Sequence, residues 1–454
     1  MTIFKHFHLL SFLSITLYSP TYSQNVPDDR KYGCTWHGGS VAKLSCNCEP
    51  WAEMILKPNS IDSYSTSEIL INGCKSIRIE ANAISQMRNL RTLALSNVGS
   101  IDFSSDSINW YGYKDYSGRL EEERFDISVP SLKIHVYASN ISRISSHAFA
   151  GRISEITLED LNIVNLEPLA FVNLLQTEKI SLRNTVLMNV GVQAFKKFST
   201  EHFELISVTA DLLPSRAISN ITVYQNVTIH NCVFNTIRSG GFTIYNPKVL
   251  QVTNNKVQHL SGEAFKVISR GFVLFRDNDF GLVDDGAFLG VKIRKDTHPG
   301  DPTFIFDSNR LSNLSSSALQ TFEPGVQFKN IYLGETCDCL GVEEKIKESE
   351  YYAELQCLND GQYTTVEYFK VHMCSVVSNY FVMIIIVSVI GCLLIVIVSG
   401  LLLYYKFVYR TRKYGNKNSS KKGPLSLIVP DGRTYRETEL HVIVERTDLL
   451  TTDL

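Results

Sequence analysis

Apolar residues in the segment VLQVTNNKVQHLSGEAF, residues 249–265, follow neither a strand nor a helix pattern throughout. Alternation of apolar and polar positions stops after Val252, and a 3.6-residue period does not fit the remainder. The same spacing, apolar-x-apolar-x-x-Asn-x-apolar-x-x-apolar, recurs along the chain. We assign it to residues 77–87, 250–260, 273–283 and 304–314. A recurring unit of this kind predicts a repeat architecture.

Other copies keep the apolar positions and change the residue in the Asn slot. Cys232, Thr185 and Ser139 occupy the slot in three copies, whereas Leu161 and Val208 are apolar replacements. Residues 93–103 match poorly. The apolar-x-apolar start predicts a short strand with one buried face. The slot falls in the turn after that strand, where an Asn side chain both donates and accepts. Stacked slots therefore predict a ladder that satisfies turn backbone groups, and Cys232 is interpreted as a buried ladder residue.

A second mark follows each copy by five residues and is usually phenylalanine. The marked positions, 22 to 24 residues apart, are Phe149, Phe171, Phe195, Ile218, Phe242, Phe265 and Phe288. This period predicts a solenoid, with the marked side chains filling the core from the convex side. Residues 104–128 and 292–302 interrupt the period and are interpreted as insertions.

Two apolar segments concern targeting. Residues 1–23 combine Lys5, a short apolar run and small residues before position 24, which predicts a secretory signal peptide. Residues 381–403 contain no charge and are long enough to span a bilayer. The 17 residues that follow position 405 hold seven Lys/Arg and no Asp/Glu, which predicts a cytoplasmic side there. We therefore expect a type I plasma-membrane protein, with 24–379 outside and 406–454 inside.

The cysteines and glycosylation sequons agree with an oxidising, extracellular environment. Two groups of four cysteines predict disulfides rather than metal sites: Cys34, Cys46, Cys48 and Cys74, then Cys337, Cys339, Cys357 and Cys374. Four sequons begin at Asn140, Asn220, Asn226 and Asn313. The net charge of −2 gives no indication of a nucleic-acid partner.

This pattern resembles the extracellular leucine-rich-repeat family, L-x-x-L-x-L-x-x-N/C-x-L, over roughly residues 34–374. The resemblance implies a strand-dominated α/β solenoid, a horseshoe of about nine to ten repeats. Its implied domains are an N-terminal cap (24–76), repeats (77–327) and a C-terminal cap (328–374). The family's cap pairing implies the disulfides Cys34–Cys48, Cys46–Cys74, Cys337–Cys357 and Cys339–Cys374. A parallel β-helix, which also stacks Asn residues and is used by carbohydrate enzymes, is the alternative fold.

The sequence contains no G-x-S-x-G, no H-E-x-x-H and no phosphate-binding glycine loop. Asp284-Asp285 is interpreted as solvated or capping, and His230 as a single imidazole on a strand. We therefore expect no enzyme, no metal and no cofactor. Binding is the expected activity, through side chains beside the strand apolars on the concave face. The predicted ligand-binding residues are Tyr137, Glu159, Asp160, Arg183, Asn184, His230, Asn231, Gln251, Thr253, Asn254, Arg276, Asp277 and Asp307.

The tail carries two short motifs. Thr452 and Leu454 resemble a class I PDZ ligand, in which the terminal carboxylate binds backbone amides and Leu454 enters a pocket. Glu445, Leu449 and Leu450 resemble an acidic dileucine sorting signal. The leading hypothesis is a cell-surface recognition or adhesion receptor that binds an extracellular protein and docks a PDZ scaffold or adaptor. The alternatives are a membrane organiser or sorting protein acting through its tail, and a β-helix carbohydrate enzyme.

Overall fold

The computed structural model describes residues 32–38, 42–61, 66–85, 87, 89–110, 131–294, 304–314, 317, 319, 325–339, 347, 349 and 351–414. The predicted signal peptide and both tail motifs lie outside these residues, as do the larger parts of the two predicted insertions. The chain divides into two compact units, Met1–Val377 and Ser378–Leu454.

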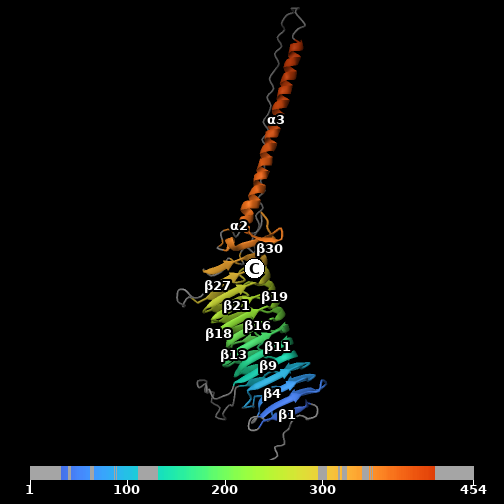
Figure 1. Ribbon diagram of the computed structural model, residues 1–454, viewed down its shortest axis with the longest axis vertical. Helices are drawn as coiled ribbons and strands as arrows, with labels where there is room; N and C mark the ends of the chain where they lie inside the picture. The colour runs from blue at the N-terminus through green and yellow to red at the C-terminus, as the bar shows by residue number, and fades with distance from the viewer. Residues whose placement is uncertain are drawn as a thin grey trace, which may run out of the picture. The chain divides into compact units, whose positions relative to one another are not determined.

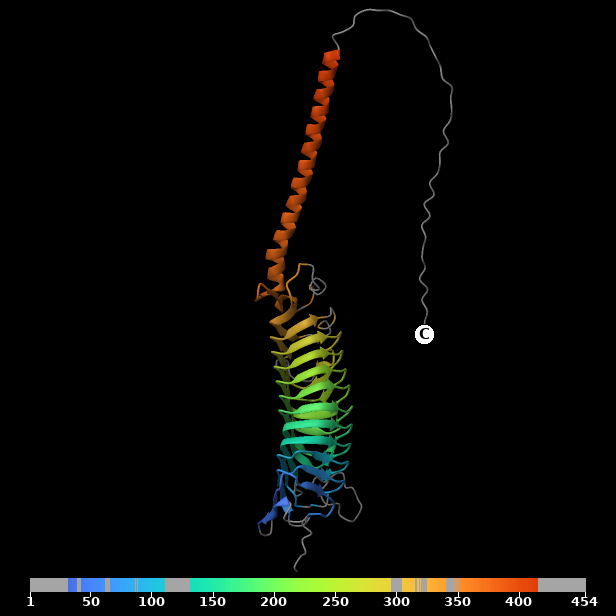
Figure 2. The same cartoon turned by 90° about the vertical axis from the view of Figure 1, so that its right-hand side faces the viewer.

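The first unit is a solenoid of about 11 turns in which parallel strands form three faces around one apolar core (Figures 1 and 2). Face A comprises β2 (Ala42–Asn47), β4 (Thr66–Asn72), β6 (Thr92–Ser96), the first halves of β9 (Leu132–Ile144) and β11 (Ile153–Leu166), β13 (Thr177–Arg183), β16 (Ser199–Ile206), the second half of β18 (Ile218–His230), β21 (Val249–Thr253), β24 (Phe272–Arg276), β27 (Phe304–Asp307) and β29 (Val326–Lys329).

Face B follows face A in every turn. It comprises β3 (Glu53–Leu56), β5 (Ser76–Ile79), β7 (Ile101–Phe103), the second halves of β9 and β11, β14 (Val186–Val190), β17 (Thr209–Leu213), β19 (Val233–Ile237), β22 (Lys256–Leu260), β25 (Asp279–Val283), β28 (Arg310–Leu314), β30 (Ile331–Thr336) and β31 (Leu355–Asn359).

Face C completes the turn. It comprises β8 (Ile108–Trp110), β10 (Phe149–Gly151), β12 (Phe171–Leu174), β15 (Phe195–Lys196), the first half of β18, β20 (Phe242–Tyr245), β23 (Phe265–Ser269) and β26 (Val291–Ile293). The prediction of a strand-dominated solenoid is confirmed. The third side of the turn is also a strand, where the α/β expectation allowed a helix, so the cross-section has the three-faced form of the alternative fold.

The copy assigned to residues 77–87 is out of frame. Ile77 and Ile79 belong to face B, and Asn82 is exposed with φ 59°. The correct frame places Leu93 and Leu95 in face A, in register with Ile134 and Val136. Parallel stacking also reaches back to β2 and β3, ahead of the predicted start of the repeats at residue 77.

The predicted side-chain ladder lies at the corner between faces A and B. Asn255, Asn278 and Asn309 are buried, and each donates its amide to a strand carbonyl of the preceding turn, at 2.8–2.9 Å. Each amide oxygen also accepts the backbone N–H of the preceding slot, beginning with the N–H of Cys232 at 2.9 Å. The slots Thr185 and Ser139 donate to strand carbonyls in the same corner. The ladder prediction is therefore confirmed.

Cys232 is expected to behave as a buried neutral thiol. Burial raises its pKa from 9.0 to about 11, although hydrogen bonds with backbone groups act in the opposite direction. Because the fold favours the protonated thiol, its contribution to stability is complete below pH 9 and decreases as the pH rises toward 11. We expect an aromatic disulfide reagent to leave Cys232 unmodified in the folded chain at pH 8 and to modify it after unfolding. Modification at equal rates in both states would contradict this assignment.

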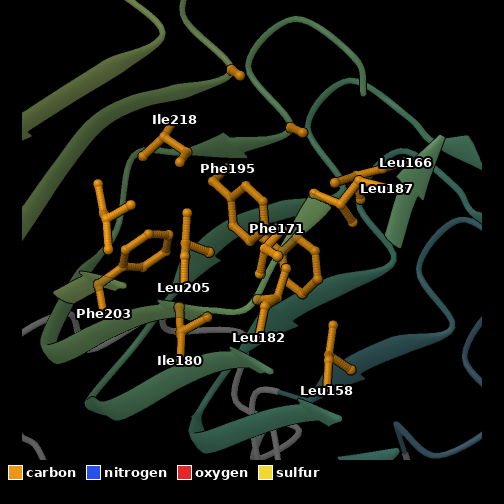
Figure 3. Packing of buried hydrophobic residues seen from close by; sticks show 14 of the residues in the cluster. Leu158, Leu166, Phe171, Ile180, Leu182, Leu187, Phe195, Phe203, Leu205 and Ile218 are labelled. Atoms are coloured by element: carbon orange, nitrogen blue, oxygen red, sulfur yellow. The ribbon is translucent and has the colours of Figure 1, made fainter. Parts of the chain in front are cut away.

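The phenylalanine marks form an interior column on face C. Phe149, Phe171 and Phe195 stack with ring centroids 4.7 and 4.5 Å apart and interplanar angles of 10° and 4°. Phe242 and Phe265 stack in the same way at 5.1 Å. Figure 3 shows Phe171 and Phe195 facing Leu182 and Leu205 from face A. The predicted register of the marks is confirmed, because Phe171, Phe195 and Ile218 are direct strand partners.

The disulfides differ from the expected pairing at the N-terminal side. Cys34 bonds Cys46 and Cys48 bonds Cys74, so the expected Cys34–Cys48 and Cys46–Cys74 pairs are wrong. The reason is local: β1 (Cys34–His37) runs antiparallel to β2, which places Cys34 directly opposite Cys46.

The expected C-terminal pairs, Cys337–Cys357 and Cys339–Cys374, are both present. They join a region that also contains η2 (Tyr352–Glu354), β32 (Gln362–Thr365), α2 (Val366–Phe369) and η3 (Lys370–Cys374).

Helix α3 (Ser375–Tyr414) contains the predicted span, residues 381–403. The part from Tyr380 to Arg410 is long and apolar enough to cross a membrane, and its large apolar side chains are exposed. This is what a lipid-facing segment requires, since a helix with apolar residues all round is stable only in an apolar environment.

Candidate functional site

The outward side of face A carries one continuous row of side chains, which we name the outward row. Strand register places its members next to one another in the order Ser96, Tyr137, Glu159, Arg183, Ile206, His230, Thr253, Arg276, Asp307 and Lys329. Seven of the predicted binding residues belong to this row. Gln251 lies in the neighbouring row, between Thr228 and Leu274. The structure thus brings these eight residues onto one surface.

Ion pairs organise the middle of this surface around Glu204. Arg183 donates from Nη2 to Glu204 Oε2 at 2.8 Å, and Lys179 Nζ lies 3.1 Å from the same oxygen. Burial acts to raise the pKa of Glu204, but hydrogen bonds from Arg183, Lys179 and Ser181 outweigh this effect and lower the pKa below its ordinary value. Glu204 therefore stays ionised at neutral pH.

Glu204 was absent from the sequence prediction. It belongs to the copy whose slot holds Val208, where the repeat pattern is weak. The signal that points to it is its position between the two strand apolars Phe203 and Leu205.

Further along the row, charged and polar groups also bond to their neighbours. Arg276 Nε donates to Asp307 Oδ2 at 3.1 Å, and His230 Nδ1 lies 2.8 Å from Thr253 Oγ1. Tyr137, near the N-terminal end of the row, has 49% of its side chain exposed. The row therefore presents a positioned polar surface and an exposed aromatic ring, which is the mixture found at protein interfaces.

The other five predicted binding residues occupy a turn. Asp160, Asn184, Asn231, Asn254 and Asp277 have φ between 50° and 57°, the left-handed region. They belong to a corner row, with one member in each turn: Gly73, Asn97, Ala138, Asp160, Asn184, Ser207, Asn231, Asn254, Asp277, Ser308 and Asn330.

The backbone N–H groups of Asn184, Asn231, Asn254 and Asp277 each donate to a carbonyl of the following turn. Asn and Asp tolerate this conformation better than other non-glycine residues, so a backbone requirement explains their identity. The binding prediction did not anticipate this structural role.

Replacing Ala138 with glycine is expected to stabilise the solenoid. Ala138 has φ 46° in the corner row, and the left-handed conformation costs a residue with a Cβ about 1–2 kcal/mol. Glycine removes this cost but loses more backbone entropy on folding, which destabilises by about 0.5–1 kcal/mol. The free energy of unfolding should therefore rise by roughly 0.5 kcal/mol or more. Chemical denaturation of the two proteins measures it. The control is Ala210→Gly inside β17, where a buried methyl is lost and stability should fall. A decrease for both variants would contradict the expected effect at Ala138.

The sequons are distributed over different faces. Asn140 is exposed on face B, and Asn226 is exposed at the start of the face A part of β18. Asn220 is exposed on face C with φ 55°. Asn313 lies in β28. The three exposed asparagines are thus accessible positions for a glycan.

Among the residues that the structure describes, no group of three or more His, Cys, Asp or Glu side chains is arranged to hold a metal ion. The surface that the sequence and structure jointly define is therefore the outward row of face A with its neighbouring row. Comparison with models of known protein families gives no match for this chain, and comparison with curated proteins gives none either.

Proposed function

We propose that the chain is a cell-surface recognition or adhesion receptor of type I topology. The observation that carries the proposal is the outward row, which extends from Ser96 to Lys329 across the solenoid with polar, charged and aromatic side chains. An extended concave or flat face of a solenoid is a surface on which a protein ligand makes many contacts. The spacing shared with leucine-rich repeats supports the same interpretation.

The second support is the combination of disulfides with α3. Four disulfides agree with an oxidising compartment for the solenoid, and α3 is long and apolar enough to cross a membrane. The basic residues after position 405 support a cytoplasmic position for residues 406–454 in a plasma-membrane protein. In this topology Leu454 and Thr452 are available to a PDZ scaffold, and the solenoid binds a partner outside.

An adhesion assay with the full-length chain tests this function. Cells that display the chain are captured on a panel of cell monolayers under flow, with surface amount measured by an antibody to the solenoid. We expect at least one monolayer to capture these cells more than untransfected cells, and we expect Tyr137→Ala with Glu159→Lys to remove the difference. Deleting residues 451–454 should abolish capture of PDZ scaffolds and leave adhesion unchanged.

The matched control changes Met188 and Asn189 on face B, away from the outward row. Adhesion equal to that of untransfected cells on every monolayer would contradict the receptor function. Unchanged adhesion in the Tyr137 and Glu159 variant would place the binding surface elsewhere.

A further inference from the structure

A groove opens where face C meets face A, in the turns built from β12 to β18. Its volume is about 920 Å³, and its lining includes Leu175, Gln176, Lys197, Glu201, Asn220 and Tyr224. None of the residues predicted to bind a ligand on face A belongs to this lining.

Differences of a single residue in turn length create the groove. Phe171 pairs with Phe195, and Thr177 pairs with Thr200. The segment from Phe171 to Thr177 is therefore one residue longer than the matching segment from Phe195 to Thr200. This extra length makes Leu175 and Gln176 protrude, and Leu175 is 38% exposed. The next turn, from Phe195 to Thr200 across β15 and β16, is the shorter one. It forms the floor of the groove.

The opposite wall arises in the same way. Thr200 pairs with Val223, but His202 pairs with Asn226, so β18 contains one extra residue at this point. The ring of Tyr224 is displaced outward and is 45% exposed, and Arg270 donates a hydrogen bond to its backbone carbonyl. Because parallel strands are about 4.8 Å apart, the backbones of the two walls, two turns apart, are separated by roughly 10 Å, and the groove lies between their side chains.

Asn220 lines this groove and lies on the same strand as Tyr224. Asn173, Lys197 and Asn220 stack as consecutive left-handed residues, each two positions after the face C mark. This conformation makes Asn220 an exposed residue at the groove, and Asn220-Ile-Thr222 is a glycosylation sequon.

We propose that the groove holds the first sugars of an N-linked glycan on Asn220. The apolar face of Tyr224 suits sugar C–H groups, and exposed Gln176, Glu178 and Lys197 offer acceptors and donors for hydroxyl groups. A glycan that starts inside the groove has a high effective concentration there, so weak contacts suffice. The inference rests on the extracellular placement of the solenoid in the proposed function.

The test measures release of each glycan by a peptide N-glycosidase from the full-length protein made in secretory cells. In the native protein we expect release at Asn220 to be roughly tenfold slower than at Asn226, because the enzyme requires opening of the groove contacts. The difference should disappear after denaturation. Tyr224→Ala should accelerate native release at Asn220, whereas Tyr137→Ala, a matched exposed tyrosine outside the groove, should not.

Enzymatic release also converts Asn220 to Asp, and this happens after the protein has folded. A second measurement, hydrogen exchange, therefore compares proteins that folded in the same way. Hydrogen exchange of peptides covering 173–178 and 197–201 should increase after release at Asn220. Equal native release at Asn220 and Asn226, or an Asn220 that carries no glycan while Asn140 and Asn226 do, would overturn the inference alone. Absence of glycans from all four sequons would instead overturn the extracellular placement.

Discussion

Replacing Asn278 with alanine is expected to lower the free energy of unfolding by about 4 kcal/mol, one of the two largest effects that we predict. Asn278 donates to the Val252 carbonyl at 2.8 Å and accepts the N–H of Asn255 at 3.0 Å. Both partners are buried backbone groups, the carbonyl near the end of β21 and the N–H in the corner that follows this strand. Their loss of a hydrogen bond costs about 1–3 kcal/mol each, beyond the lost packing of the amide.

Hydrogen exchange measured by mass spectrometry locates this effect. In a solenoid each turn contacts only its neighbours, so exchange should accelerate in peptides covering residues 249–283 and change little in those covering 132–166. The control is Asn235→Ala, since Asn235 is exposed and its side-chain amide donates to the side chain of Asp211, at 2.9 Å from Oδ1. That substitution should cost less than about 1 kcal/mol. Equal losses for the two alanine variants would mean that the ladder contributes no more than a surface hydrogen bond.

Replacing Phe171 with alanine should be comparably destabilising, by about 4 kcal/mol. The Phe171 ring has no exposed surface and stacks between Phe149 and Phe195. Alanine leaves a cavity in the middle of the column and removes two ring contacts, each worth roughly 0.5–1.5 kcal/mol. Denaturant titration followed by circular dichroism measures the change.

Tyr137→Ala is the matched control for the aromatic column, because this ring is half exposed on face A. Its loss should cost less than about 1 kcal/mol. Phe171→Leu should recover part of the stability by filling the cavity. A Phe171→Ala variant as stable as Tyr137→Ala would show that the column is not the source of stability that its burial indicates.

The repeat frame was readable from the sequence wherever two signals coincide. In residues 250–265 the ladder position Asn255 and the mark Phe265 agree, and the structure confirms both. At residues 77–87 the Asn signal acts alone. An apolar-x-apolar strand occurs on face B as well as on face A, and asparagine is as suitable for an exposed left-handed corner as for a buried ladder. Asn82 therefore matches the pattern while occupying the other corner.

Other features depended on geometry that no single repeat encodes. The Cys34–Cys46 bond follows from the antiparallel direction of β1, which spacing alone does not specify. The third strand of each turn covers as few as two residues, Phe195 and Lys196, too few to produce a periodic pattern. The walls of the groove come from differences of one residue between adjacent turns, visible only after the turns are aligned. The outward row was predictable, because side chains beside buried strand residues must face outward.

Two antiparallel strands in the described part of the solenoid unit bear on its solubility. A parallel stack ends in strands whose free N–H and C=O groups are a template for another chain, and solenoids joined end to end would grow into fibres. Here β1 lies against β2 and β32 lies against β31, each reversing the strand direction. Cys34–Cys46 fastens the first reversal covalently, and Cys337–Cys357 anchors β31 beneath the second. An interior that could repeat without limit is thus covered at each end by a strand of reversed direction, which does not continue the parallel stack.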